Sequence, residues 1–346
     1  MQTFYKIILI TLILCISNTA IYSQVADTSS LSDTLSIEKW LTFAISTKFS
    51  AKNIVTSSIN DAENNKWIIT DGDGLAFFDG ISLQVYDRKN SKLPGDNLYE
   101  IAIEGSTKWI ATYGYGLVAL IGDSIWKIFN TENSELKSNY LLSLAIDHNG
   151  NKWMGIGMKG LAKFDGENWT HYDTENSGLP DNIIHTIIED DDSMMWFGTE
   201  KGGLVSYDGK DWTVYQSSNS GLTENWVSSL VIDMKGVLWI GSFGGGLVSF
   251  DHGKWGSYMI SNSGMPNNAV YSVAIDDQNR KWIGTGGGGL ICFDGDKTWT
   301  IFDSYNSQLP SDFIYSVQID NKNNITIGMW RGGVAFYNEN GLDFSK

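Results

Sequence analysis

The chain has 346 residues, a formal net charge of −16, and 14 tryptophans and 37 glycines beside only 4 prolines. Frequent Trp and Gly together favour a β-rich structure with many tight turns. The acidic balance excludes binding to nucleic acid and docking on an anionic membrane, since both need clustered Lys and Arg.

Residues 1–23 have the pattern of a secretory signal peptide. Lys6 supplies the positive charge, and residues 7–16 form an apolar run that is too short to span a bilayer. Cys15 does not follow a small residue, which favours a secretory signal over a lipoprotein signal. We therefore expect an exported protein, periplasmic or at the cell surface, without a membrane span once the signal is removed.

Residues 24–36 are rich in Ser and Thr and lack an apolar period, so we expect a linker there. After the signal peptide the chain keeps a single cysteine, Cys292, which leaves no internal disulfide to stabilise the fold. The fold must therefore be held by burial of apolar side chains, and we expect a monomer.

Tryptophan recurs with a period of 42 to 44 residues. Eight residues after each of these positions stands Leu or Val, and a Gly always precedes it. Seven copies of the pattern follow one another, the last with Thr in place of Trp. The recurring positions are Trp67, Trp109, Trp153, Trp196, Trp239, Trp282 and Thr326.

Each repeat contains four strand-like pieces, which in the sixth copy are 269–276, 281–285, 289–294 and 299–303. Turns rich in Asp, Asn and Gly separate the first two pieces, as expected of hairpins. Four short strands in a repeat of about 43 residues are typical of a β-propeller blade. The sequence therefore predicts an all-β fold over residues 37–346, a seven-bladed propeller of four-stranded blades.

The two ends of the chain predict how the ring closes. Residues 38–61 align without a gap on residues 297–320, so Trp40 takes the place of Trp299 in a fourth strand. The last copy has only three strands. We therefore expect the N-terminal strand to complete the last blade, which also protects an open sheet edge.

The stretches "LWIGSFGGGLVSFD" and "KWIGTGGGGLICFD", together with "NSGLPDN", resemble the two-component regulator propeller repeat. The resemblance extends over nearly all of residues 37–346. It implies a sensory, extracytoplasmic propeller that detects carbohydrate, as in hybrid histidine kinases. The 346 residues contain no kinase or DNA-binding module, so the resemblance implies sensing without kinase activity.

The glycine run Gly284-x-Gly286-x-x-Gly289 matches a dinucleotide-binding pattern, but a strand follows it where that loop needs a helix. An Asp closes the first strand of six repeats, and its recurrence favours a turn acceptor over a metal ligand. No catalytic triad, paired carboxylates or metal-ligand cluster stands out. We expect no metal and no cofactor.

Residues that differ between blades are the candidates for ligand binding, because loops on a rigid scaffold carry binding disproportionately. The loops between the second and third strands should surround one mouth of the central channel. Their variable residues combine flat aromatic faces with hydrogen-bonding groups, a mixture that suits a sugar. These rim residues are Asp71, Asp73, Tyr113, Tyr115, Glu200, Lys201, Phe243, Trp330 and Arg331.

A second ring of candidates stands five residues before the acid that closes each first strand. Innermost strands border the channel of a propeller, so these side chains should line it. The ring consists of Thr56, Tyr99, Leu142, His185, Ser228, Tyr271 and Tyr315.

Three functions follow from these candidates. The first is a non-enzymatic module that binds carbohydrate or another small ligand and passes a signal to a membrane sensor kinase or an envelope protein. The second is a polysaccharide or lactone lyase that uses His185 with Tyr271 or Tyr315 for proton transfer. The third is a scaffold for protein–protein interaction, because a propeller rim also binds peptides.

Overall fold

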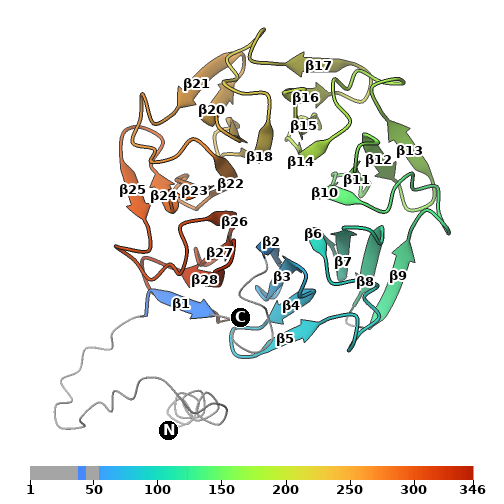
Figure 1. Ribbon diagram of the computed structural model, residues 1–346, viewed down its shortest axis with the longest axis horizontal. Coiled ribbons are helices and arrows are strands. Elements are labelled where there is room, and N and C mark those ends of the chain that lie inside the picture. Colours follow the sequence, from blue (N-terminus) through green and yellow to red (C-terminus); the bar gives the residue numbers. More distant parts are fainter. Residues whose placement is uncertain (1–37, 44–53, 123, 346) are drawn as a thin grey trace. The chain divides into compact units, whose positions relative to one another are not determined.

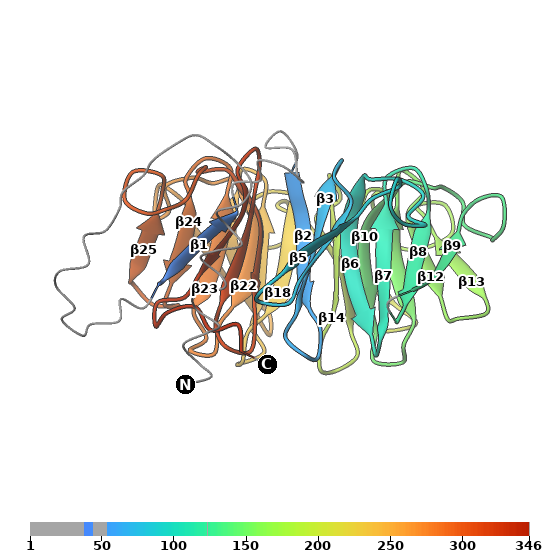
Figure 2. The same cartoon turned by 90° about the horizontal axis from the view of Figure 1, so that it is seen from below.

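The computed structural model describes residues 38–43, 54–122 and 124–345, and the signal peptide and linker expected at 1–23 and 24–36 lie outside them. The described residues from Lys39 onward form one unit, in which seven four-stranded antiparallel sheets are arranged in a ring (Figure 1). The side view shows the inner strands running along the axis of the ring (Figure 2). Throughout the described residues we find no helix long and apolar enough to cross a bilayer.

In each blade four strands are hydrogen-bonded side by side, from the innermost strand at the channel to the outer strand. The innermost strands are β2 (Ile54–Asn60), β6 (Leu98–Glu104), β10 (Leu141–Ile146), β14 (Ile184–Glu189), β18 (Val227–Ile232), β22 (Val270–Ile275) and β26 (Ile314–Ile319). The second strands are β3 (Lys66–Asp71), β7 (Thr107–Thr112), β11 (Lys152–Ile156), β15 (Met195–Thr199), β19 (Leu238–Ser242), β23 (Lys281–Thr285) and β27 (Ile325–Met329). The third strands are β4 (Leu75–Phe78), β8 (Leu117–Ile121), β12 (Leu161–Phe164), β16 (Leu204–Tyr207), β20 (Gly246–Asp251), β24 (Leu290–Phe293) and β28 (Gly333–Tyr337). The outer strands are β5 (Leu83–Tyr86), β9 (Ile125–Phe129), β13 (Trp169–Tyr172), β17 (Trp212–Tyr215), β21 (Lys254–Tyr258), β25 (Trp299–Phe302) and β1 (Trp40–Phe43).

The N-terminal strand closes the ring, which confirms the predicted closure. Strand β1 pairs antiparallel with β28 and places Trp40 opposite Tyr337. The equivalent pair in the preceding blade is Trp299 opposite Phe293, so Trp40 holds the predicted fourth-strand position. The first and last blades also share an apolar core that includes Val55 and Phe336.

The hydrophobic core lies between neighbouring blades. Second strands are buried along nearly their whole length, as in β19 and β23. The second-strand tryptophans pack against the next blade; Trp153, for example, contacts Phe197 with ring centroids 5.7 Å apart. Outer-strand tryptophans are partly buried against the same cores. The single cysteine of the propeller, Cys292, is buried and free.

In six of the seven blades a hydrogen bond joins the acid that closes the inner strand to the second-strand indole. In blade five, Asp233 accepts the Nε1–H of Trp239 at 2.9 Å, and its other oxygen accepts the turn amides of Lys235 and Val237. The same indole bond occurs in five further blades, from Trp67, Trp109, Trp153, Trp196 and Trp282. The recurring acid is therefore a turn acceptor as predicted, and Glu104 takes its place in blade two.

The last blade lacks the tryptophan, and its closing acid pairs with a lysine of the first blade. Asp320 accepts Lys66 Nζ from the first blade at 2.7 Å, and both side chains are almost completely buried. Asn324 adds a hydrogen bond of 2.8 Å to the same carboxylate oxygen. Elsewhere in the ring a closing acid also pairs with a lysine of the next blade, between Glu104 and Lys152 and between Asp233 and Lys281. At Asp320 the same pairing joins the last blade to the first.

The glycine run of the sixth repeat is explained by close backbone approach. Gly289 has φ +77°, and a Cβ atom there would lie 2.2 Å from the carbonyl oxygen of Phe302 on the outer strand. A side chain at this position would both strain the backbone and collide with the neighbouring strand. The glycine is therefore needed by the blade itself. This agrees with the prediction that a glycine run followed by a strand is not a dinucleotide-binding loop.

We expect the substitution Asp233→Asn to destabilise the fold. Burial alone would raise the pKa of Asp233, but hydrogen bonds from Trp239, Lys281 and turn amides lower the pKa to about 2. The amide would leave the buried Lys281, 3.0 Å away, without its anionic partner. Losing one partner of a buried pair costs about 3 kcal/mol of unfolding free energy, measurable by urea denaturation. Asp277→Asn, at an exposed position, is the control. Equal stability of the two variants would contradict a stabilising role of the Asp233 carboxylate.

Candidate functional site

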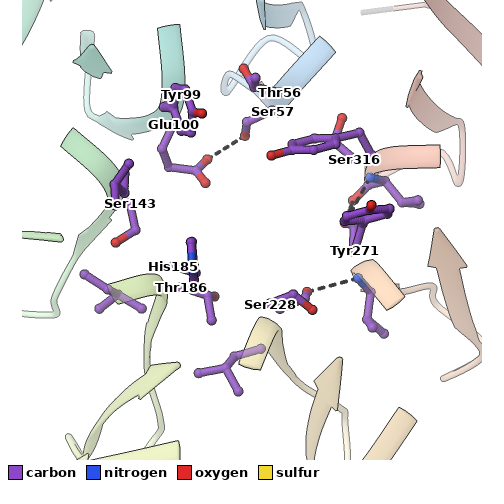
Figure 3. A pocket seen from close by; sticks show the side chains of 18 of the residues that line it. Thr56, Ser57, Tyr99, Glu100, Ser143, His185, Thr186, Ser228, Tyr271 and Ser316 are labelled. Atoms are coloured by element: carbon purple, nitrogen blue, oxygen red, sulfur yellow. Dashed lines mark hydrogen bonds between the residues drawn. The ribbon is translucent and has the colours of Figure 1, made fainter. Parts of the chain in front are cut away.

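The inner strands enclose a cavity of about 370 Å³ at the centre of the ring. This volume lies in the range of ~300–1,000 Å³ that is usual for small-molecule sites. Side chains from all seven inner strands line the cavity, and those labelled in Figure 3 surround an open centre.

A β-bulge in every inner strand explains why two successive residues reach the cavity. In β14, for example, the register shifts between Ile184 and Thr186, which leaves His185 as the extra residue. A bulge turns the extra side chain away from the normal alternation. The seven extra residues are Thr56, Tyr99, Leu142, His185, Ser228, Tyr271 and Tyr315, and all line the cavity.

Aromatic rings form a continuous arc along one side of the cavity. His185 stacks on Trp226 at 5.7 Å between centroids, and Trp226 contacts Phe243 at 4.7 Å. The arc continues from Phe243 to Tyr271 at 5.6 Å and from Tyr271 to Tyr315 at 5.4 Å. Five rings from four blades thus present a nearly unbroken apolar surface to a ligand.

The three ionisable groups of the arc, His185, Tyr271 and Tyr315, are uncharged at neutral pH. Burial lowers the pKa of His185, although Glu200 opposes the shift with Oε2 3.4 Å from Nε2. Burial raises the pKa of Tyr271 and, more strongly, that of Tyr315. At neutral pH the imidazole is therefore an uncharged acceptor, and the two phenols stay protonated.

One carboxyl group lies among the cavity-lining residues. Glu100 follows Tyr99 on β6 and accepts hydrogen bonds at Oε1 from Ser57 Oγ and from the amide of Ile101. Burial raises the pKa of Glu100 to about 7, because the two hydrogen bonds, which lower the pKa, only partly offset the effect of burial. Among the described residues no group of three or more His, Cys, Asp or Glu side chains is placed to hold a metal ion.

The predicted rim residues do not form one site. Phe243 belongs to the aromatic arc, and Glu200 lies behind it beside His185. Trp330 and Arg331 border a separate hollow with Phe313. The remaining five lie outside the cavity lining. Asp71, the last residue of β3, accepts a hydrogen bond from Asn97, and Asp73 stands two residues further along the chain. Tyr113 stacks on Tyr99, Tyr115 covers Gly95, and the Lys201 side chain is exposed.

Sequence reasoning missed Trp226 and Glu100. Trp226 stands two residues before the extra residue of its bulge, where the other blades have Ile54, Asn97, Tyr140, Ile183, Ala269 and Phe313. Glu100 occupies the position after the extra residue, where every other blade has Ser or Thr. Comparison of these two positions across the repeats would have found both residues.

Two segments, residues 178–201 and 221–244, match the family model described as two component regulator propeller. The fold defines the protein as a seven-bladed β-propeller. Two of its repeats thus match the family that the sequence pattern resembles.

Solved structures with the same fold are distant in sequence. The extracellular domain assigned to a hybrid two component system, BT3049 from B. thetaiotaomicron, has a TM-score of 0.73 and 21% identity over 88% of this chain and 44% of that one. This chain thus spans less than half of that domain. Catalytically inactive virginiamycin B lyase from Staphylococcus aureus with quinupristin has a TM-score of 0.69 and 12% identity, covering 86% and 98%.

A third structure, YCF48 bound to D1 peptide, has a TM-score of 0.65 and 16% identity, covering 90% of this chain and 98% of that one. At these identities the three likenesses show the fold alone. No curated protein matches the sequence.

The raised pKa of Glu100 predicts a pH-dependent stability. Below about 4.5 the carboxyl is protonated in both the folded and the unfolded chain, whereas between 4.5 and about 7 only the unfolded chain releases the proton. The wild-type protein should therefore lose stability relative to Glu100→Gln as the pH rises through this window. Melting temperatures from pH 4.5 to 8 measure the difference. The exposed Glu63→Gln is the control, and a constant gap for Glu100→Gln would contradict the shift.

Proposed function

We propose that the protein is an exported module that binds carbohydrate in the central cavity and serves as the sensing part of a signalling system. The observation that carries the proposal is the aromatic arc from His185 to Tyr315 beside a cavity lined with hydroxyl groups. A sugar ring has an apolar C–H face and a hydroxyl-bearing edge. It can therefore stack on the arc while its hydroxyls bond to inner-strand side chains.

The signalling part of the proposal draws support from the repeat family and from the fold of the sensor domain described above. A module of this kind needs a partner that carries the signal onward. A membrane sensor kinase or an envelope protein is the partner class that the family's description suggests.

Substitutions in the arc test the carbohydrate site. We expect Trp226→Ala and Tyr271→Ala each to weaken glycan binding about tenfold, the equivalent of about 1.4 kcal/mol for a lost stacking surface. A glycan array selects the ligand, and isothermal titration calorimetry measures the affinity. Tyr305→Ala, at a 95% exposed ring, and Trp330→Ala, at the separate hollow, should retain full affinity.

Two results would contradict the proposal. One is the absence of any glycan ligand for the wild-type protein. The other is equal loss of binding in the arc variants and in Tyr305→Ala, which would mean that the aromatic arc has no special role. A pull-down from envelope extract would then test the scaffold function.

A lyase is the second candidate, because His185 combines a neutral imidazole with a carboxylate 3.4 Å away. Such an imidazole can accept a substrate proton, and the protonated phenol of Tyr271 can donate one to a leaving group. A lyase would convert the bound glycan to an unsaturated product that absorbs in the ultraviolet. Turnover lost in His185→Ala but kept in Trp330→Ala would favour catalysis, whereas binding without turnover would favour sensing.

A further inference from the structure

One position of the inner strand carries a hydroxyl group in six of the blades. In the second blade it carries a carboxyl group. It directly follows the extra residue of the bulge, so its side chain also lines the cavity. The residues at this position are Ser57, Glu100, Ser143, Thr186, Ser229, Ser272 and Ser316.

The serines at this position connect neighbouring blades. Ser143 Oγ donates to the carbonyl of Ile184 at 2.9 Å, and Ser229 Oγ accepts the amide of Val273 at 3.1 Å. A hydroxyl group therefore serves the ring well at this position. The carboxyl of Glu100 is not required by the architecture, since the same chain uses Ser or Thr in the equivalent place six times.

The Glu100 carboxyl is only half satisfied. Oε1 receives the hydrogen bonds from Ser57 and Ile101, and none of the hydrogen bonds or ion pairs of the described residues involves Oε2. Figure 3 shows the side chain reaching from β6 toward the open centre. One carboxylate oxygen is thus left for a ligand.

Among the described residues, no Lys or Arg lines the cavity opposite this carboxyl. The lining residues contributed by the adjacent strands β2 and β10 are neutral, among them Thr56 and Leu142. The other titratable groups that line the cavity are Tyr99, His185, Tyr271 and Tyr315, and no Lys or Arg is among the described lining residues. A buried carboxylate without a counter-ion is costly and is usually paired.

We propose that the cavity recognises a ligand with a primary ammonium group, which pairs with Glu100 while the rest of the ligand stacks on the aromatic arc. The ring faces of Tyr271 and Tyr315 also suit a cation, because aromatic quadrupoles attract positive charge. The inference rests on the proposed carbohydrate function and makes it more specific. The ligand class is then glycans with an unacetylated amino sugar.

Three trisaccharides that differ only at C2 test the inference. The β-1,4-linked trimers of glucosamine, N-acetylglucosamine and glucose carry ammonium, acetamide and hydroxyl groups there. In calorimetry with the propeller and its preceding linker at pH 7, we expect the glucosamine trimer to bind at least about tenfold more tightly than the other two, the effect of one charge-assisted hydrogen bond.

Two variants connect this preference to the carboxyl. Glu100→Gln keeps the size of the side chain, and Glu100→Ser restores the hydroxyl of the other blades. Both should bind the three trimers with similar affinity, while the exposed Glu63→Gln should keep the preference. Both Glu100 variants should melt at or above the wild-type temperature at pH 7, because they remove an unpaired buried charge, so lost preference does not reflect unfolding.

The pH dependence gives an independent signature. In the free protein the ionised fraction of Glu100 rises between pH 5.5 and 7, while the alkyl diamine cadaverine remains fully cationic. Wild-type affinity for cadaverine should therefore increase about tenfold over this interval, since only the ionised form pairs with the ammonium. In Glu100→Gln the affinity should stay constant.

The outcomes separate the inference from the proposed function. Equal affinity of the wild-type protein for all three trimers would overturn the ammonium site and leave carbohydrate binding in place. Binding of the diamine cadaverine in a Glu100-dependent manner, with no trimer bound, would support the ammonium site and overturn carbohydrate binding. Failure of the trimers and of cadaverine would overturn the ammonium site directly.

Discussion

The hydrogen bond between the closing acid and the second-strand indole is the contact on which the propeller depends. It ties the first hairpin turn of a blade to the buried face of its second strand, so this turn and a large core side chain are positioned together. Because Trp239 also packs against Tyr258 and Phe293, one side chain links turn, blade and neighbouring blade. The last blade lacks the indole but keeps the pairing of its closing acid with a lysine of the next blade, which Asp233 and Lys281 also form, so this contact continues across the point where the ring closes.

The side chains that line the cavity are set by a second repeated feature, the bulge of the inner strand. Regular alternation would send every second side chain into the inter-blade core, whereas the bulge lets residues such as Tyr271 and Ser272 both reach the channel. The surrounding blades bury their own apolar faces independently of these positions. Cavity residues can therefore differ from blade to blade without loss of the scaffold, and the aromatic arc and the single carboxyl are two such differences.

Most of the fold was predictable because packing repeats at a fixed interval. The period of the tryptophans gave the number of blades, and the alignment of residues 38–61 gave the closing strand. The candidate site was harder to predict. Distance from the tryptophan identified loop residues, but backbone bridges such as Tyr113 to Tyr140 hold these loops at the rim, and most of their side chains do not reach the cavity. Trp226 and Glu100 were missed because strand alternation alone does not reveal that a bulge points two successive residues inward.

Ring closure through β1 also sets the order in which the protein can become complete. Trp40 is made before six complete blades, but its partner Tyr337 is made after them. The central blades join residues that are close in the chain and can form as they emerge, whereas the last blade must wait for its final strand. Until then the emerging chain exposes an unpaired strand edge at each end, the kind of surface that recruits other chains. A chain released before residue 333 would therefore be an open ring with two unpaired edges, so synthesis through β28 is itself a condition for solubility.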